Sequence, residues 1–302
     1  MNAPVVQFSE VSKRFAAVHA LKGLTFDLPA GGVVGLLGRN GAGKSTALRT
    51  LVGLYAPDTG SVRVLGRDPL TFDVAIRRRI GYLSDDGVPF PAATGKALLR
   101  LCAPLYPSWS RALEDQMLAR FHIDPRRKLK ELSLGQQRAV ALLLALCPQP
   151  ELLILDEPAA NLDPVLRREF LDTVLSLVAT EQRTVILSSH VLSDIERIAD
   201  RVMILHHGQL LLNSPLDDLK ENARRLRFVF PAAPPERLPL PGAFAVRRSG
   251  RELLTTVMEF DEATVTRLAS TLGARVEATP VKLDELFIDL VGDGSEHASA
   301  AA

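Results

Sequence analysis

The positions of apolar residues along the chain predict a parallel α/β core preceded by antiparallel strands. From Val5 to Leu28, apolar and polar residues alternate between turn breaks, which is typical of half-buried antiparallel strands. Continuous apolar runs then occupy residues 32–38, 152–155 and 184–187, and such short runs are typical of strands buried on both faces. Because helical segments separate these runs, we expect the three strands to pair in a parallel sheet.

Two further regions complete the predicted organisation. Residues 85–150 are rich in Leu, Ala and Arg at helical spacing, so they are interpreted as a helical subdomain inserted between two core strands. After a strand at 202–205 we place a boundary, which gives a main domain over residues 1–220, a small α+β accessory domain over 221–291 and a disordered tail over 292–302. In the accessory domain we expect strands at 226–230, 244–247 and 253–258, and helices at 261–272 and 283–291.

A glycine-rich segment joins the first core strand to a helix predicted over residues 45–54. Residues 38–45, GRNGAGKS, match the phosphate-binding pattern GxxxxGK[ST] in the strand, loop and helix context that this pattern requires. The glycines allow backbone N–H groups to surround a phosphate, Lys44 would bridge the β- and γ-phosphates, and Ser45 would offer its hydroxyl to Mg²⁺. The candidate phosphate-binding residues are Gly38, Asn40, Gly41, Gly43, Lys44, Ser45 and Thr46.

Two adjacent carboxylates end the second core strand. Residues 152–157 read LLILDE, so Asp156 lies at the tip of the strand and Glu157 directly after it. Asp156 can reach Mg²⁺ through water, and Glu157 is placed to polarise the water that attacks a γ-phosphate. The pair therefore predicts hydrolysis of a nucleoside triphosphate.

A third motif indicates the family. Residues 132–138, LSLGQQR, read almost as LSGGQ ahead of an amphipathic helix. With the two preceding motifs, this makes residues 5–219 resemble the ATP-binding subunit of an ABC transporter, with its P-loop NTPase fold of parallel core, antiparallel β-subdomain and helical signature subdomain. The resemblance implies a head-to-tail dimer with a second ATPase subunit, in which Ser133, Gly135 and Gln136 contact the ATP held by the partner.

The resemblance assigns roles to single residues elsewhere in the chain. Phe15 would stack on adenine, His190 would contact the γ-phosphate and help position Glu157, and the aspartate-loop residue Asp163 would couple the two sites of the dimer. Asp85 stands where the family has the Q-loop glutamine, and we expect it to keep a role beside Mg²⁺. Two smaller departures are Leu134 and Asn161, which replace glycines of the family pattern.

Composition and charge narrow the partners. The 302 residues carry 36 basic and 35 acidic side chains, so the net charge of +1 gives no reason to expect a nucleic-acid partner. The longest apolar run, 139–147, is about half of the roughly 18 residues that a membrane-spanning helix needs. The two cysteines form no CxxC pair and no leader is visible, which favours the cytoplasm.

Two short segments resemble the bacterial ABC-2-like exporters of the bacitracin-resistance and Ytr types. They are LYPSW at 105–109 and LDELF at 283–287. This resemblance implies an ATP-hydrolysing motor, peripheral on the inner face of the cell membrane, that powers a separate multi-spanning permease for export and receives that permease at residues 89–109. A soluble ABC ATPase with a regulatory or a nucleic-acid- or ribosome-linked role, and no transport, remains the alternative at this stage.

Overall fold

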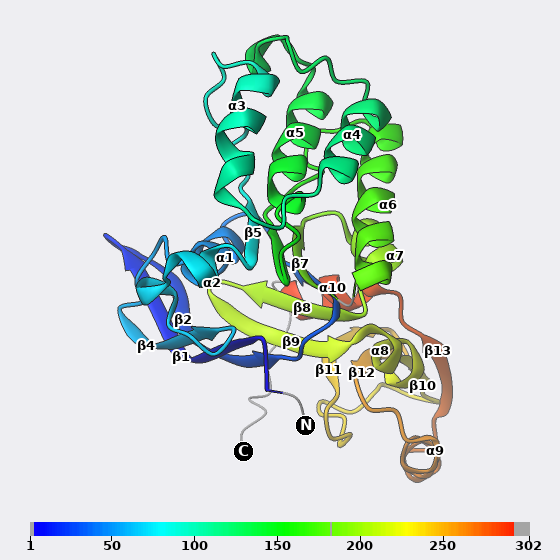
Figure 1. Cartoon of the computed structure of the whole chain (residues 1–302). Coiled ribbons are helices and arrows are strands. Elements are labelled where there is room, and N and C mark those ends of the chain that lie inside the picture. Colours follow the sequence, from blue (N-terminus) through cyan, green and yellow to red (C-terminus); the bar gives the residue numbers. More distant parts are fainter. Residues whose placement is uncertain (1–2, 182, 293–302) are drawn as a thin grey trace. The chain divides into compact units, whose positions relative to one another are not determined.

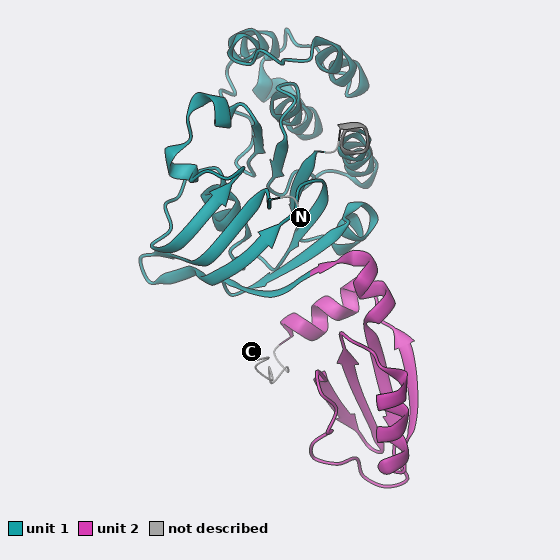
Figure 2. Cartoon of the chain, turned by 60° about the horizontal axis from the view of Figure 1, so that its bottom comes forward, with its two compact units in different colours: residues 1–213 teal, residues 214–302 magenta. Residues whose placement is uncertain are grey.

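The computed structural model describes residues 3–181 and 183–292, which divide into two compact units. The units comprise residues 1–213 and 214–302 and are coloured separately in Figure 2. Helix α8 (Leu216–Asn222) thus groups with the second unit, whereas the boundary predicted after residue 220 would run through this helix. The backbone explains this grouping, because the carbonyl of Asn222 accepts a hydrogen bond of 3.0 Å from the N–H of Phe260. Apart from Gly292, the predicted disordered tail lies outside the described residues.

A six-stranded sheet forms the centre of the first unit, as Figure 1 shows. Its strands in chain order are β3 (Gly32–Leu37), β5 (Ile80–Leu83), β6 (Leu152–Leu155), β7 (Thr184–Ser189), β8 (Arg201–His206) and β9 (Gln209–Pro215). The spatial order is β5-β6-β7-β3-β8-β9, and the four neighbouring pairs from β5 to β8 are parallel. Leu155 pairs with Leu187 and Leu37 with Ser189, so the carboxyl ends of β6, β7 and β3 meet at one edge.

A separate antiparallel sheet covers part of this core. It consists of β1 (Val6–Phe15), β2 (Val18–Leu28) and β4 (Thr59–Val64), in the order β2-β1-β4. Its inward-facing residues pack with those of the central sheet, and the rings of Phe8 and Phe26 stack at 4.6 Å. The alternating pattern predicted β1 and β2.

The helices of the first unit surround the central sheet and build the inserted region. They are α1 (Lys44–Leu51), α2 (Val74–Arg77), α3 (Gly95–Cys102), α4 (Arg111–Arg120), α5 (Leu134–Leu146), α6 (Pro164–Glu181) and α7 (Leu192–Ile198), with short 3₁₀ helices at Pro69–Thr71, Ala103–Leu105 and Leu129–Glu131. The expected helical insert contains α3, α4 and α5, which project beyond the sheet in Figure 1. Helix α1 ends three residues earlier than predicted, because Gly53 adopts a left-handed conformation with φ of +74°.

The second unit is a four-stranded antiparallel sheet with its own hydrophobic core. It contains β10 (Arg224–Val229), β11 (Phe244–Ser249), β12 (Glu252–Val257) and β13 (Arg275–Pro280), in the order β11-β12-β10-β13, with helices α9 (Glu262–Thr271) and α10 (Leu283–Val291). Leu226, Phe228, Leu253 and Val265 lie in that core. Strand β13 was not predicted, because its side chains are mostly exposed and give no apolar alternation.

Candidate functional site

The glycine-rich loop between β3 and α1 forms a rigid cradle. The Lys44 ammonium is almost completely buried and donates a hydrogen bond of 2.7 Å to the Gly38 carbonyl. Gly41 and Gly43 have φ of +80° and +106°, and a Cβ on Gly43 would lie only 2.5 Å from the Ala20 carbonyl oxygen. Only glycine fits this backbone, so the loop can keep its N–H groups directed at a ligand beside the start of α1.

A pocket of about 440 Å³ opens over this cradle. It brings together nearly all the candidate phosphate-binding residues with Phe15, Asp85 and Glu157, which come from distant parts of the sequence. Its lining consists of Phe15, Val18, Ala20, Arg39, Asn40, Gly41, Ala42, Gly43, Lys44, Ser45, Thr46, Asp85 and Glu157. Gly38 lies just behind the lining, where its carbonyl holds Lys44.

Asp156 is completely buried at the end of β6 and is held by Ser188, a residue that no sequence motif indicated. The Ser188 hydroxyl donates to Asp156 Oδ1 at 2.7 Å and accepts the backbone N–H of Glu157 at 2.8 Å. Burial raises the pKa of Asp156, while the hydroxyls of Ser188 and Ser45 oppose that rise. Ser188 directly precedes the Ser189-His190 pair, and the pairing of Leu155 with Leu187 places it opposite Asp156.

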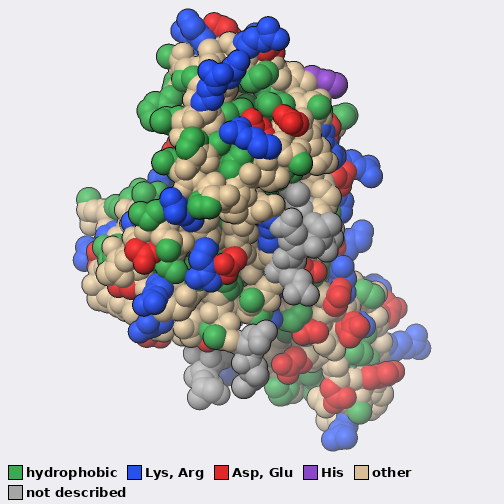
Figure 3. All heavy atoms as spheres, viewed as in Figure 1, with side chains coloured by type: hydrophobic (Ala, Val, Ile, Leu, Met, Phe, Trp, Pro, Cys, Tyr) green, Lys and Arg blue, Asp and Glu red, His purple; other side chains and the backbone are tan. Residues whose placement is uncertain are grey.

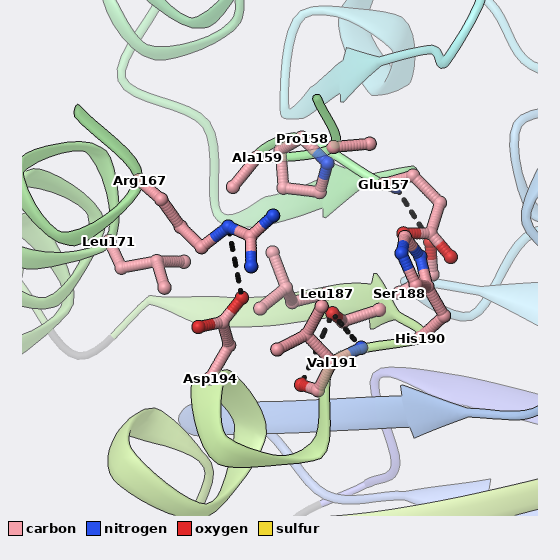
Figure 4. Close-up of a pocket in the computed structure, with 12 residues that line it drawn as sticks. Glu157, Pro158, Ala159, Arg167, Leu171, Leu187, Ser188, His190, Val191 and Asp194 are labelled. Atoms are coloured by element: carbon pink, nitrogen blue, oxygen red, sulfur yellow. Dashed lines mark hydrogen bonds and ion pairs between the residues drawn. The ribbon is translucent and has the colours of Figure 1, made fainter. Parts of the chain in front are cut away.

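Glu157 lies between a cation and an imidazole. Its Oε1 is 3.3 Å from Lys44 Nζ, and its Oε2 is 2.8 Å from Nδ1 of His190, toward which it points in Figure 4. Its backbone adopts φ of +46°, a strained value for a glutamate. The Glu157 side chain is 15% exposed and that of His190 51% exposed, so the carboxylate is shielded while the imidazole reaches solvent. A carboxylate held in this way can orient and polarise a water.

The residues at the strand edge fit a magnesium ion. Asp156 Oδ2 is buried and has no hydrogen-bond partner within the described residues, and the Ser45 hydroxyl lies close enough to affect the pKa of this carboxyl group. In the described part of the chain, no three His, Cys, Asp or Glu side chains gather into a metal cage. Magnesium is commonly held by one or two protein oxygens together with substrate phosphates and water, and this donor set matches that pattern.

Glu157 and His190 also line a second, much smaller pocket. Figure 4 shows Arg167 and Asp194 facing each other across it, 3.8 Å apart. Burial raises the pKa of Asp194, and the positive charge of Arg167 opposes the rise. The volume of about 10 Å³ leaves no room for more than a water molecule.

The signature residues and Asp163 do not line the nucleotide pocket. Ser133 and Gln136 form a reciprocal capping box at the start of α5, with two hydrogen bonds of 3.2 Å. Asp163 caps α6 by accepting the N–H groups of Val165 and Leu166 at 3.0 and 3.1 Å. A Cβ on Gly135 would lie 2.8 Å from a methyl carbon of Leu166, so the two helix starts pack closely.

Two of the remaining candidates have partners that the sequence did not indicate. Phe15 is 39% exposed, lies edge-on to Tyr55 with ring centres 5.0 Å apart, and has the Lys13 ammonium 5.4 Å from its ring centre. The Asp85 carboxylate lines the pocket but is paired with Arg49 at 2.9 Å. Asn161, which stands where the family pattern has glycine, adopts φ of +62°, a conformation that asparagine tolerates better than most residues.

Comparison with known proteins now identifies the family. A family model described as ABC transporter matches residues 21–160. The bacitracin transport ATP-binding protein BcrA of Bacillus licheniformis is 31% identical over 73% of this chain and 73% of its own length. The chain belongs to the ABC transporter ATP-binding proteins. ATP binding and hydrolysis, as predicted, are the activity of this ABC ATPase.

Relatives covering nearly the whole ABC ATPase support the predicted subgroup. The Nod factor export ATP-binding protein I of Rhizobium etli is 31% identical over 97% of this chain and 95% of its own length. The ABC transporter ATP-binding protein YtrB of Bacillus subtilis is 26% identical over 95% of this chain and 98% of its own. With BcrA, YtrB confirms the resemblance to the bacitracin-resistance and Ytr group.

Solved structures confirm the fold of the ABC ATPase. An ATP-binding subunit of an ABC transporter superimposes with a TM-score of 0.64 and 29% identity over 72% of this chain and 92% of that one. A dimeric ATP-binding cassette bound to ADP and phosphate gives a TM-score of 0.62 at 23% identity over 70% of this chain and 98% of that one. The predicted P-loop NTPase fold class is therefore correct.

Proposed function

We propose that this ABC ATPase closes as a head-to-tail dimer around two Mg-ATP and powers a separate multi-spanning membrane permease for export. The names of relatives support this proposal, since one is a transport and another an export ATP-binding protein. The same names favour a transport motor over a regulatory or ribosome-linked ATPase. The observation that carries the chemistry is the Glu157 carboxylate, held between Lys44 and His190 at the mouth of the phosphate cradle.

ATP would bind with its triphosphate in the glycine-rich cradle. Lys44 already points its ammonium at this space and exchanges its contact with Glu157 for the β- and γ-phosphate oxygens. Thr46 lies on the α-phosphate side, and Phe15 offers its ring face to adenine.

Hydrolysis would follow once Lys44 has turned to the phosphates. Glu157 is then free to take a proton from the attacking water, and His190 holds the carboxylate through Nδ1 and contacts the γ-phosphate. Ser45 and Asp156 would hold Mg²⁺, with Asp85 beside it, and the ion would supply positive charge to offset the charge that develops on the phosphate oxygens.

A second ATPase subunit would complete each site. Ser133, Gly135 and Gln136 lie at the start of α5, where the positive end of the helix dipole favours an anion. These groups lie outside their own chain's pocket, and in the proposed dimer they meet the γ-phosphate of the partner's ATP. Asp163 at the start of α6 would link the two sites.

The permease would dock on the helical insert. Phe90, Leu101 and Leu105 are 65%, 62% and 56% exposed, and Figure 3 shows hydrophobic side chains at the surface of this region. None of the described helices is long and apolar enough to cross a membrane. Beside such a permease the protein would lie in the cytoplasm, at the inner face of the cell membrane. We propose no nucleic-acid partner, and we assign the second unit, the predicted accessory domain, to stabilising the dimer.

The deciding experiment replaces the proposed base. Glu157→Gln keeps the size and shape of the side chain but cannot accept the proton, so we expect ATP-dependent dimers by light scattering and a loss of hydrolysis of at least about 100-fold. Glu151→Gln is the matched control, because that glutamate pairs with Arg79 on the surface, away from the pocket. Undiminished turnover in Glu157→Gln would contradict the assignment, and failure of the chain to copurify with a multi-spanning membrane protein in detergent would contradict the partner.

A further inference from the structure

Asp85 brings a negative charge into a pocket that must accept an anion. It lines the pocket together with Lys44 and Glu157. The pKa of Asp156 is raised mainly by burial, and the negative charge of Asp85 adds to the rise. The electric field of Asp85 therefore reaches the region proposed to hold the metal and the phosphates. A carboxylate in this position opposes the binding of a triphosphate unless a nearby cation compensates it.

Arg49, on the helix that follows the phosphate loop, provides that compensation. Its Nη2 lies 2.9 Å from Asp85 Oδ1 and 2.9 Å from Asp86 Oδ2. The Arg49 side chain is 22% exposed, against 40% for Asp85 and 72% for Asp86. The pair with Asp85 is therefore the less screened of the two, and only Asp85 lines the pocket.

Contacts with other residues hold both members of the Arg49–Asp85 pair in place. Arg49 Nη1 donates to the Tyr55 hydroxyl at 3.3 Å, its guanidinium lies 6.0 Å from the Tyr55 ring, and that ring packs against Phe15. On the other side, Arg138 of α5 donates a hydrogen bond of 3.1 Å to the backbone carbonyl of Asp85. The guanidinium is thus anchored beside the proposed adenine platform, and the backbone that carries the Asp85 side chain is anchored to the signature helix.

We propose that Arg49 is a positioning residue for nucleotide binding, which neutralises Asp85 and holds its carboxylate aside from the triphosphate. The Arg49–Asp85 pair is then electrically neutral as a unit, so it would oppose the triphosphate no more than a single neutral side chain at the Asp85 position would. The proposal rests on the assignment of the pocket as the ATP site. Arg49 is absent from the pocket lining and acts through Asp85.

The test is a double-mutant cycle on ATP affinity in the full-length chain. Calorimetric titration with ATP in EDTA and low salt separates the effect from any role of Asp85 toward the metal. We expect Arg49→Gln to weaken ATP binding about 5-fold, as one uncompensated charge several ångströms from the phosphates would do. The same substitution in an Asp85→Asn background is expected to change the affinity by less than about 2-fold, because the charge to be compensated is gone.

Two controls separate this effect from general damage. Asp86→Asn removes the other partner of Arg49 and is expected neither to change ATP affinity nor to remove the effect of Arg49→Gln. Arg79→Gln breaks a bidentate pair of the same kind with Glu151, away from the pocket, and is expected to leave ATP binding at the wild-type level.

Three results would overturn the proposal: an unchanged affinity in Arg49→Gln, an equal loss in both backgrounds, or weaker metal-free binding in Asp85→Asn alone. The last variant keeps the test decisive if Arg49→Gln does not fold. Lys44→Ala tests the pocket separately: if this variant bound ATP as tightly as the unaltered protein, the assignment of the ATP site would be wrong. If the unaltered protein binds ATP but the mutant cycle gives one of the three results above, only the role of Arg49 is contradicted.

Discussion

Ser188→Ala tests whether one buried hydroxyl holds both carboxylates of the site in place. Ser188 is fully buried, donates to Asp156 Oδ1 at 2.7 Å and accepts the N–H of Glu157 at 2.8 Å. The substitution removes only the oxygen, so packing changes little while two buried polar groups lose a partner. Since Asp156 Oδ2 already lacks a hydrogen-bond partner in the described structure, its carboxylate would lose the bond that supports it best.

The size of the effect follows from these two bonds. A hydrogen bond to a buried charged group contributes about 1.5–3 kcal/mol and a neutral one about 1 kcal/mol, so Ser188→Ala should lower the free energy of unfolding by about 2.5–4 kcal/mol. The strained backbone of Glu157, with φ of +46°, would lose a restraint as well. We expect the kcat for ATP hydrolysis to fall at least about 10-fold, which corresponds to about 1.4 kcal/mol in the barrier.

Urea denaturation and steady-state ATPase assays measure the two effects. The neighbouring Ser189→Ala is the matched control, since its hydroxyl accepts the N–H of Val191 at 2.9 Å, donates weakly to the Val191 carbonyl at 3.4 Å, and bonds to no carboxylate. It should cost about 1 kcal/mol. If Ser188→Ala were no less stable than Ser189→Ala and hydrolysed ATP at the wild-type rate, the idea that Ser188 organises the site would be wrong.

Three further predictions concern the cradle, the adenine platform and the second unit. Gly43→Ala should abolish ATP binding in a fluorescence titration, because its Cβ would lie 2.5 Å from a carbonyl oxygen, and residual tight binding would contradict the rigid cradle. Phe15→Ala should raise the Kd values for ATP and ADP equally, by about 3- to 10-fold as expected for one lost stacking contact, whereas Phe15→Tyr should leave them unchanged; an effect on ATP alone would argue against stacking. Asp289→Asn removes a buried charge that pairs with Arg225 and Arg247. The protection free energy measured by hydrogen exchange in the second unit should fall by about 2–3 kcal/mol while ATP affinity stays constant. Unaltered exchange would show that the network adds no stability.

The parts of the fold that could be predicted are those where local sequence and burial agree. The run at 152–155 is buried at every position, so its apolar residues alone are enough to identify a central strand. The two carboxylates that follow the run must then lie at the end of that strand. The same reasoning identified β3 and β7. Strand β13 shows the opposite case, since it forms at a sheet edge through backbone pairing with β10 while most of its side chains face solvent.

The parts of the site that could not be predicted depend on pairing between distant segments. Ser188 is one of two adjacent serines, and nothing in the sequence distinguishes them until the register of β6 and β7 is known. Once Leu155 is paired with Leu187, the next residues along each strand, Asp156 and Ser188, must face each other, and the hydrogen bond follows. The register of these two strands therefore determines which of the candidate residues contact one another in the site.

Arg49 illustrates a different limit, because no strand register relates it to Asp85, 36 residues away. The usable signal was the departure itself. A carboxylate at a position where the resemblance to the family implies a neutral glutamine, in a pocket proposed to bind an anion, requires a compensating cation close by. That cation must come from an element bordering the pocket, and α1 borders it and carries Arg49 one turn beyond the phosphate-binding residues. A departure from a family motif is in this sense a prediction of a second residue, and the cycle between Arg49 and Asp85 measures whether the two have to be considered as one unit.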